Sequence, residues 1–132
     1  MRRNIIFRGR EPQSGVWHTG SLVTNAHTAL IVNLGCHSID AIQVDPDTVQ
    51  QMTNCYHNGR TVWEGDVYAD PARPDLRYIV HYDIVRDEFR IALPDEGHKT
   101  RLSMPLAYYL AGHDELEYVC NILDLTDNTD KP

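Results

Sequence analysis

The sequence has no closely spaced cysteines, no long apolar run and no signal-like N-terminus. Its three cysteines, Cys36, Cys55 and Cys120, are widely separated, and no C-x-x-C spacing is present. Because an odd number of dispersed cysteines does not suit a disulfide framework, they favour a reducing cytoplasm. No run approaches the roughly 18 apolar residues of a membrane span, and MRRNIIFRGR has too short an apolar centre for a secretory signal. We therefore predict a cytoplasmic protein without a membrane partner.

Positive charge is also scarce. The net charge is -7, with five basic and six acidic residues in positions 1 to 66 and seven and thirteen in positions 67 to 132. Such a balance argues against broad, non-specific nucleic-acid binding, which neutralises phosphates with Lys and Arg. One local candidate remains near the N-terminus, where a small β-barrel would present four arginines and two aromatic residues to a nucleic acid: Arg2, Arg3, Phe7, Arg8, Arg10 and Trp17.

The common catalytic and cofactor-binding motifs are absent. The sequence has no GxSxG, P-loop or dinucleotide fingerprint, and its histidines show no H-x-x-x-H or H-E-x-x-H pairing. Cys55 and His57 lie two residues apart on an expected strand, but no third group is evident to orient the histidine as a base. We predict no catalytic residues, no bound metal and no cofactor, and therefore a protein that is not an enzyme.

What is present is enough for one folded domain. The 132 residues, 42% hydrophobic and 23% charged, resemble an ordinary globular chain. We expect a single β-rich domain over residues 1–123 and an acidic tail over residues 124–132 that frays.

Short runs of β-forming residues recur along the chain, separated by turn residues. About seven or eight strands and one or two short helices are expected, which favours a mainly β fold, a small barrel or sandwich of short antiparallel strands. In the second run Trp17 is the natural core anchor and Gly20 marks a bulge or a close backbone approach. Arg86-Asp87 is the expected turn of a hairpin.

Two further segments carry local signals. Residues 70–75 contain two prolines and predict an exposed loop. Ser103, followed by Pro105 and later by Gly112, predicts a short helix with a serine cap.

The stretch from Val44 to Tyr68 holds the densest turn chemistry in the chain. Asp45 is placed to cap one helical turn that begins at Pro46. Asn58-Gly59 is a strong signal for a turn with positive φ. The strand that follows is expected to be interrupted at Gly65.

This stretch also carries a resemblance. RNIIFR at 3–8, WHTG at 17–20, VDPDTVQQMT at 44–53, VWEGDV at 62–67 and LEYVCNI at 116–122 are similar to the YopX-like family of phage and prophage proteins, and the middle block is the specific part. The resemblance implies a mostly β protein of a bacterial host's phage or prophage, with no established biochemical activity. Its signature residues, which we interpret as structural, are Asp45, Pro46, Thr48, Gln51, Thr53, Gly59, Glu64, Gly65 and Asp66.

The chain departs from the family pattern at two places. Asn54-Cys55 stands where glycine and leucine are usual, and Cys120 stands where glycine is usual. Asparagine tolerates left-handed backbone and cysteine packs as a small hydrophobe, so local repacking accommodates both. The segment from Asp70 to Gly112 matches no family pattern, and a variable function would lie there.

The acidic residues of the stretch support an alternative. Asp45, Asp47, Glu64 and Asp66 together would offer Mg²⁺ or Ca²⁺ the oxygen ligands of a nuclease-like metal enzyme. The competing interpretation is that Asp45 caps a turn and that Glu64-Gly65-Asp66 forms a bend whose carboxylates satisfy nearby backbone donors. We expect the structural role.

The leading hypothesis is a non-enzymatic module that acts by contact with protein. Edge strands in a short β domain pair readily across a subunit interface, so we expect self-association into a homo-oligomer. A phage or host protein is the other expected partner. Nucleic-acid binding is the less favoured alternative.

Overall fold

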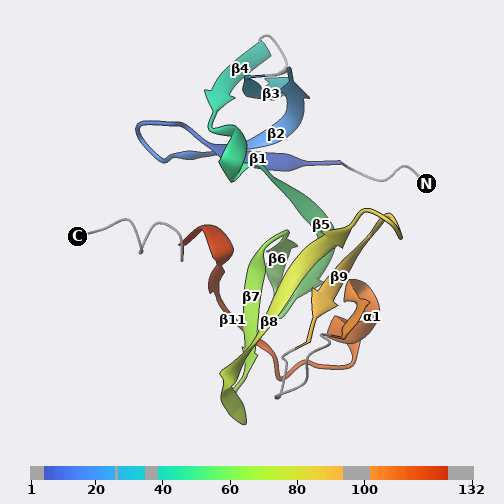
Figure 1. Ribbon diagram of the computed structural model, residues 1–132. Coiled ribbons are helices and arrows are strands. Elements are labelled where there is room, and N and C mark those ends of the chain that lie inside the picture. The colour runs from blue at the N-terminus through green and yellow to red at the C-terminus, as the bar shows by residue number, and fades with distance from the viewer. Residues whose placement is uncertain (1–4, 26, 35–38, 94–101, 125–132) are drawn as a thin grey trace. The chain divides into compact units, whose positions relative to one another are not determined.

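The protein is built from short antiparallel strands and two short helices (Figure 1). The computed structural model describes residues 5–25, 27–34, 39–93 and 102–124. The chain divides into two compact units, Met1–Met52 (unit 1) and Thr53–Pro132 (unit 2). The predicted mainly β, antiparallel fold is confirmed, while the single domain over residues 1–123 stays a prediction and the tail after residue 124 lies outside the described residues. No helix among the described residues combines the length and the apolar content that a membrane crossing requires.

Unit 1 contains one antiparallel sheet whose strands follow one another in the order β4-β3-β2-β1, with the start of β5 added beside β1. Turn-forming residues separate the strands, as the sequence predicts for hairpins. The elements are β1 (Phe7–Arg10), β2 (Trp17–Thr24), β3 (Ala29–Leu34), β4 (Ile39–Val44), the 3₁₀ helix η1 (Pro46–Thr48) and the start of β5 (Gln50–His57).

The core of unit 1 is small, so its backbone packs closely. The buried apolar residues are Ala29, Ile31 and Val44. A Cβ added at Gly20 would lie 2.5 Å from the carbonyl oxygen of Val32, which confirms the predicted close approach at this glycine. Only glycine fits here without moving the neighbouring strand.

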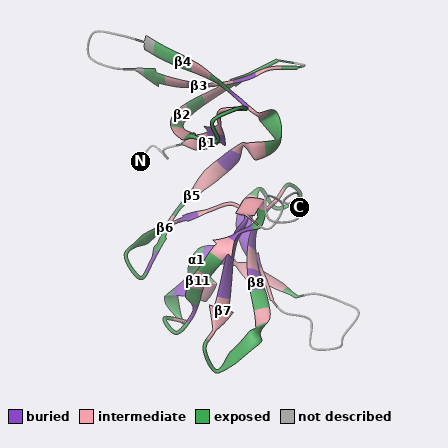
Figure 2. Ribbon diagram, turned by 90° about the vertical axis from the view of Figure 1, so that its left-hand side faces the viewer, coloured by how far each residue is buried: buried purple, intermediate pink, exposed green. Residues whose placement is uncertain are grey.

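Unit 2 encloses a larger core. The β5–β6 hairpin and a five-stranded sheet of order β10-β9-β8-β7-β11 both contribute to it, in a sandwich-like arrangement. Figure 2 shows buried residues along β7 and β8. Neither sheet closes into a barrel over the described ranges. The elements are β6 (Arg60–Trp63), β7 (Asp66–Asp70), β8 (Arg73–Asp83), β9 (Glu88–Ala92), β10 (Ser103–Pro105), α1 (Leu106–Ala111) and β11 (Glu117–Asn121).

The predicted loop over residues 70–75 is exposed at 71–75, as expected, but it is shorter than predicted, because only residues 71 and 72 form a turn. Asp70 and Arg73 pair across a tight turn, and β8 already includes Pro74. The Asp70 carboxylate accepts from the backbone N–H of Ala72 at 2.9 Å, which stabilises the turn. Proline is tolerated because this part of the strand is exposed and needs no inward donor.

The predicted serine cap of the helix is wrong. Ser103 belongs to β10, and α1 begins after Pro105, which makes no side-chain cap hydrogen bond. The helix does end at Gly112, as expected. The Arg86-Asp87 hairpin is confirmed. β8 and β9 pair from Ile79 opposite Ala92 to Asp83 opposite Glu88, and Asp87 in the turn has a φ of 52°.

Candidate functional site

The signature residues of unit 1 join η1 to the end of β1. The Asp45 carboxylate accepts from the backbone N–H of Asp47 at 3.0 Å, and Pro46 occupies the first turn. This is the cap that the sequence predicts. The Asp45 N–H donates to the carbonyl of Arg10 at 2.7 Å, and the Arg10 N–H donates to Thr48 Oγ1 at 2.9 Å. Asp45 and Thr48 therefore act as structural partners of β1.

Gln51 and Thr53 lie on β5. Gln51 is paired with Phe7 of β1. Thr53 is buried, its hydroxyl donates to the carbonyl of Val62 at 2.7 Å, and it accepts from the N–H of Cys55. Thr53 thereby holds the two strands of the hairpin together.

Asn54 and Cys55 take the backbone conformation and the packing that their residue types favour. Asn54 has a φ of 64°, which is the left-handed conformation that a glycine would adopt most easily. Cys55 packs against the core of unit 2. The β7–β11 register shifts between Tyr118 and Cys120, so the second departure lies at an irregularity of the strand.

Asn58 and Gly59 form the predicted turn of the β5–β6 hairpin, with φ values of 51° and 79°. A Cβ at Gly59 would meet nothing within 4 Å, so the backbone conformation alone requires glycine there. Asn58 also donates from its side chain to the carbonyl of Asp114 at 3.2 Å. The turn thus connects the hairpin to the segment before β11.

Asp66 is the most buried of the predicted site residues, with 0% of its surface exposed. Its Oδ2 accepts from the backbone N–H of Trp63 at 2.8 Å, and its Oδ1 accepts from Asn121 Nδ2 at 2.9 Å. The Trp63 contact confirms that the carboxylate satisfies a nearby backbone donor. Asn121 was not predicted as a site residue. The only hint in the sequence was its place in the segment 116–122, which resembles the YopX-like closing segment.

Glu64 and Gly65 form the bend between β6 and β7. Asn121 Nδ2 also contacts the Glu64 carbonyl at 3.2 Å. Gly65 has a φ of 85°, donates to the carbonyl of Val80 at 2.8 Å and accepts from the N–H of Ile122 at 2.9 Å. The interruption expected at Gly65 is therefore the point at which β6 ends and a new sheet begins.

The four candidate carboxylates are divided between the two units. Asp45 and Asp47 belong to unit 1, whereas Glu64 and Asp66 belong to unit 2. Among the residues that the structure describes, no group of three or more His, Cys, Asp or Glu side chains is placed to hold a metal ion. The nuclease-like alternative thus has no ligand cluster in this part of the chain.

A pocket of about 340 Å³ opens beside α1 in unit 2, and Cys55, His57, Leu110 and Asp114 are among its lining residues. His57 is buried, and its Nε2 lies 2.8 Å from the carbonyl oxygen of Leu116. Because a carbonyl only accepts, Nε2 is the protonated nitrogen. The hydrogen bond from His57 to Leu116 therefore holds the segment before β11 in place.

Tyr68 is the one buried hydroxyl of unit 2 without a hydrogen-bond partner among the described residues. Burial raises the pKa of Tyr68 above its usual range, and the nearby Asp66 carboxylate adds to this effect. The phenol therefore stays protonated at neutral pH.

Four of the six residues predicted for nucleic-acid binding are described in unit 1, namely Phe7, Arg8, Arg10 and Trp17. The guanidinium groups of Arg8 and Arg10 lie 4.3 Å and 4.6 Å from the Trp17 ring centroid, and Arg8 donates twice to Gln50 Oε1. Trp17 is half-buried beside these arginines and lies outside the apolar core, so its predicted role as core anchor is wrong. These cation–π contacts cover part of the Trp17 ring. Arg2 and Arg3 lie outside the described residues.

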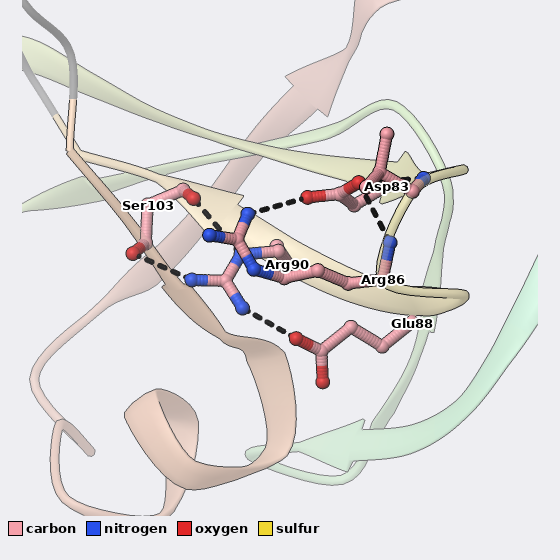
Figure 3. A network of polar contacts seen from close by, with 6 residues as sticks. Asp83, Arg86, Glu88, Arg90 and Ser103 are labelled. Atoms are coloured by element: carbon pink, nitrogen blue, oxygen red, sulfur yellow. Dashed lines mark hydrogen bonds and ion pairs between the residues drawn. The ribbon is translucent and has the colours of Figure 1, made fainter.

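Figure 3 shows the polar network around β9 in the segment that matches no family pattern. Arg90 is buried, donates to Ser103 Oγ and to the Ser103 carbonyl at 2.9 Å each, and pairs with Glu88. These contacts use Ser103 to fasten β10 to β9, which explains why it does not cap α1. Asp83 pairs with Arg86 at 2.9 Å in the neighbouring turn.

No family model, curated protein or solved structure matches this chain.

Proposed function

We propose that this chain is a non-enzymatic, self-associating β module of the kind that its resemblance to YopX-like phage and prophage proteins implies, acting in the cytoplasm of a bacterial host. The observation that carries the proposal is the edge of β4 in unit 1, beside which no further strand lies among the described residues. β4 is the last strand of its sheet and is paired with β3 over all six residues without a register shift.

The composition of β4 supports this role. Monomeric β proteins protect edge strands with Lys, Pro, bulges or inward charges. β4 reads IDAIQV, which contains no Lys, Arg or Pro, and Asp40 is its one charge. Asp40 shares the face of Ile42 and Val44, but it is exposed near the start of the strand, so the rest of the edge is regular and little protected, which favours pairing with another strand.

The predicted site residues support a non-enzymatic role. Asp45 caps a helical turn, Thr53 joins two strands and Asp66 accepts from a backbone amide and from Asn121. Their polar atoms satisfy other groups of the chain, as structural residues do.

Sedimentation velocity of the purified chain over a micromolar concentration series tests the proposal. We expect a species larger than the 15.1 kDa monomer whose fraction grows with concentration. A monomer throughout the series would contradict self-association.

Binding of a phage or host protein is the second candidate, and the tip of the β8–β9 hairpin favours it. Ile84 and Val85 are 84% and 94% exposed there. The Asp83 carboxylate accepts from the N–H groups of Val85 and Arg86, so the turn presents these apolar side chains in a fixed conformation. Loss of a specific partner from affinity captures with I84S/V85S would support this candidate.

A further inference from the structure

The open edge of β4 does not extend along the whole strand. Immediately after β4, the Asp45 N–H donates to the Arg10 carbonyl of β1, and Val44 is buried against Gly9. This end of the strand is therefore covered by its own unit. The backbone from Ile39 to Gln43 is the part that remains for pairing, and no partner on that side is present among the described residues.

The two faces of β4 restrict how a second copy can pair with it. Ile42 and Val44 lie on the more buried face, whereas Ala41 and Gln43 are exposed on the other. Residues directly opposite one another in an antiparallel pair project from the same face of the sheet. A continuous sheet with both cores on one face must therefore pair even positions with even positions and odd with odd.

Three symmetric registers near the centre of the strand satisfy this condition. They differ in which residue lies on the two-fold axis: Asp40, Ala41 or Ile42. With Asp40 on the two-fold axis, two carboxylates would lie directly opposite each other, which is unfavourable. With Ile42 on the axis, Val44 would have to pair at the end that Asp45 and Arg10 already cover. With Ala41 on the axis, only Ile39–Gln43 pair, and Asp40 lies opposite Ile42.

We propose that two copies of this chain pair their β4 strands antiparallel about a two-fold axis at Ala41, which makes one continuous sheet from the two units 1. The partner is a second copy because, in this register, all five residues of the open segment pair with their own counterparts and no like charges lie opposite each other. An isologous contact of this kind closes as a dimer. The inference rests on the proposed self-association and adds its surface, symmetry and register.

Charge at position 41 tests the register. In A41K two lysines would lie opposite each other on the axis, and in A41E two glutamates would do so. We expect each variant alone to dimerise at least about tenfold more weakly than the wild type, because like charges are juxtaposed in the interface. An equimolar mixture of the two variants should restore dimerisation, since the introduced lysine of one copy then faces the introduced glutamate of the other.

The matched control is T19K. Thr19 is exposed like Ala41, but it lies on β2, where it is paired with Arg8 of β1 and is away from the open edge. T19K should dimerise as the wild type does, and circular dichroism should show that all three variants keep their β structure.

The outcomes separate this inference from the proposed function. A monomeric wild type would overturn both. A wild type that dimerises while A41K and A41E dimerise equally well, or whose two charged variants fail to recover on mixing, would overturn the register at Ala41 and leave self-association standing.

Discussion

The two units are stabilised in different ways. Unit 2 has nine buried apolar residues in one cluster, whereas the cluster of unit 1 has three, counted over the described residues. Around its smaller cluster, unit 1 has short polar links such as Asp45 to Asp47 and close packing at Gly20. Since buried apolar area is the main favourable contribution to folding, we expect unit 2 to be the more resistant to denaturant.

Each unit carries one tryptophan, which allows the comparison to be measured. Trp17 lies in unit 1 and Trp63 in unit 2, and the chain has no other tryptophan. W17F and W63F therefore provide backgrounds in which fluorescence reports one unit at a time. A single shared transition in both backgrounds would show that the difference in core size does not separate their stabilities.

The largest effect is expected from I91A in unit 2. Ile91 is 0% exposed within the larger cluster, and its truncation should lower the free energy of unfolding by about 4 kcal/mol because it leaves a cavity. I31A is the matched change in unit 1, also at 0% exposure, and should cost about 3 kcal/mol because fewer buried neighbours surround it. Urea titration in the two tryptophan backgrounds measures both. An equal or larger loss for I31A would break the comparison.

A smaller effect is expected from D66N. The asparagine amide cannot accept from both Trp63 and Asn121, so one buried donor is left unpaired at a cost of about 2 kcal/mol. The control is D75N, because Asp75 is an exposed carboxylate on β8. Urea unfolding followed at Trp63 measures the change, and equal stability of the two variants would refute a structural role for the Asp66 carboxylate.

The smallest effect is expected from D45A in unit 1. Loss of the cap should lower the free energy of unfolding by about 1 kcal/mol, since the Asp47 N–H loses its acceptor. D47A is the control, because Asp47 is exposed in the same turn and does not supply the cap. Thermal unfolding followed at Trp17 should rank D45A below D47A, and the reverse order would show that the polar link does not stabilise unit 1.

Features that depend on neighbouring residues were predictable from the sequence. Asp45 reaches an amide two residues away, and Asn58-Gly59 adopts the positive φ that its residue types favour. The left-handed conformation of Asn54 is one that asparagine tolerates better than most residues. In each case the hydrogen bond or the preferred φ involves only residues within one turn. Such a feature can therefore be predicted without knowing which distant segments pack nearby.

Features that depend on distant segments were not predictable. Pro74 suggests a loop, but β7 pairs with this segment and draws it into a strand. Ser103 suggests a helix cap, but Arg90, thirteen residues earlier, takes both its hydroxyl and its carbonyl. Local propensity is a weak prior, and a partner from another strand overrides it.

The sequence by itself determined that the protein is mainly β, that its strands are short and antiparallel, and where its tightest turns lie, because turn and cap chemistry acts over a few bonds. Only the tertiary structure decided that Asp66 pairs with Asn121, 55 residues away, and that β4 lies at the end of its sheet. Strand order is set by packing between segments far apart in the chain. The proposed dimer contact depends on that order, because the same six residues in the middle of a sheet would have no open edge.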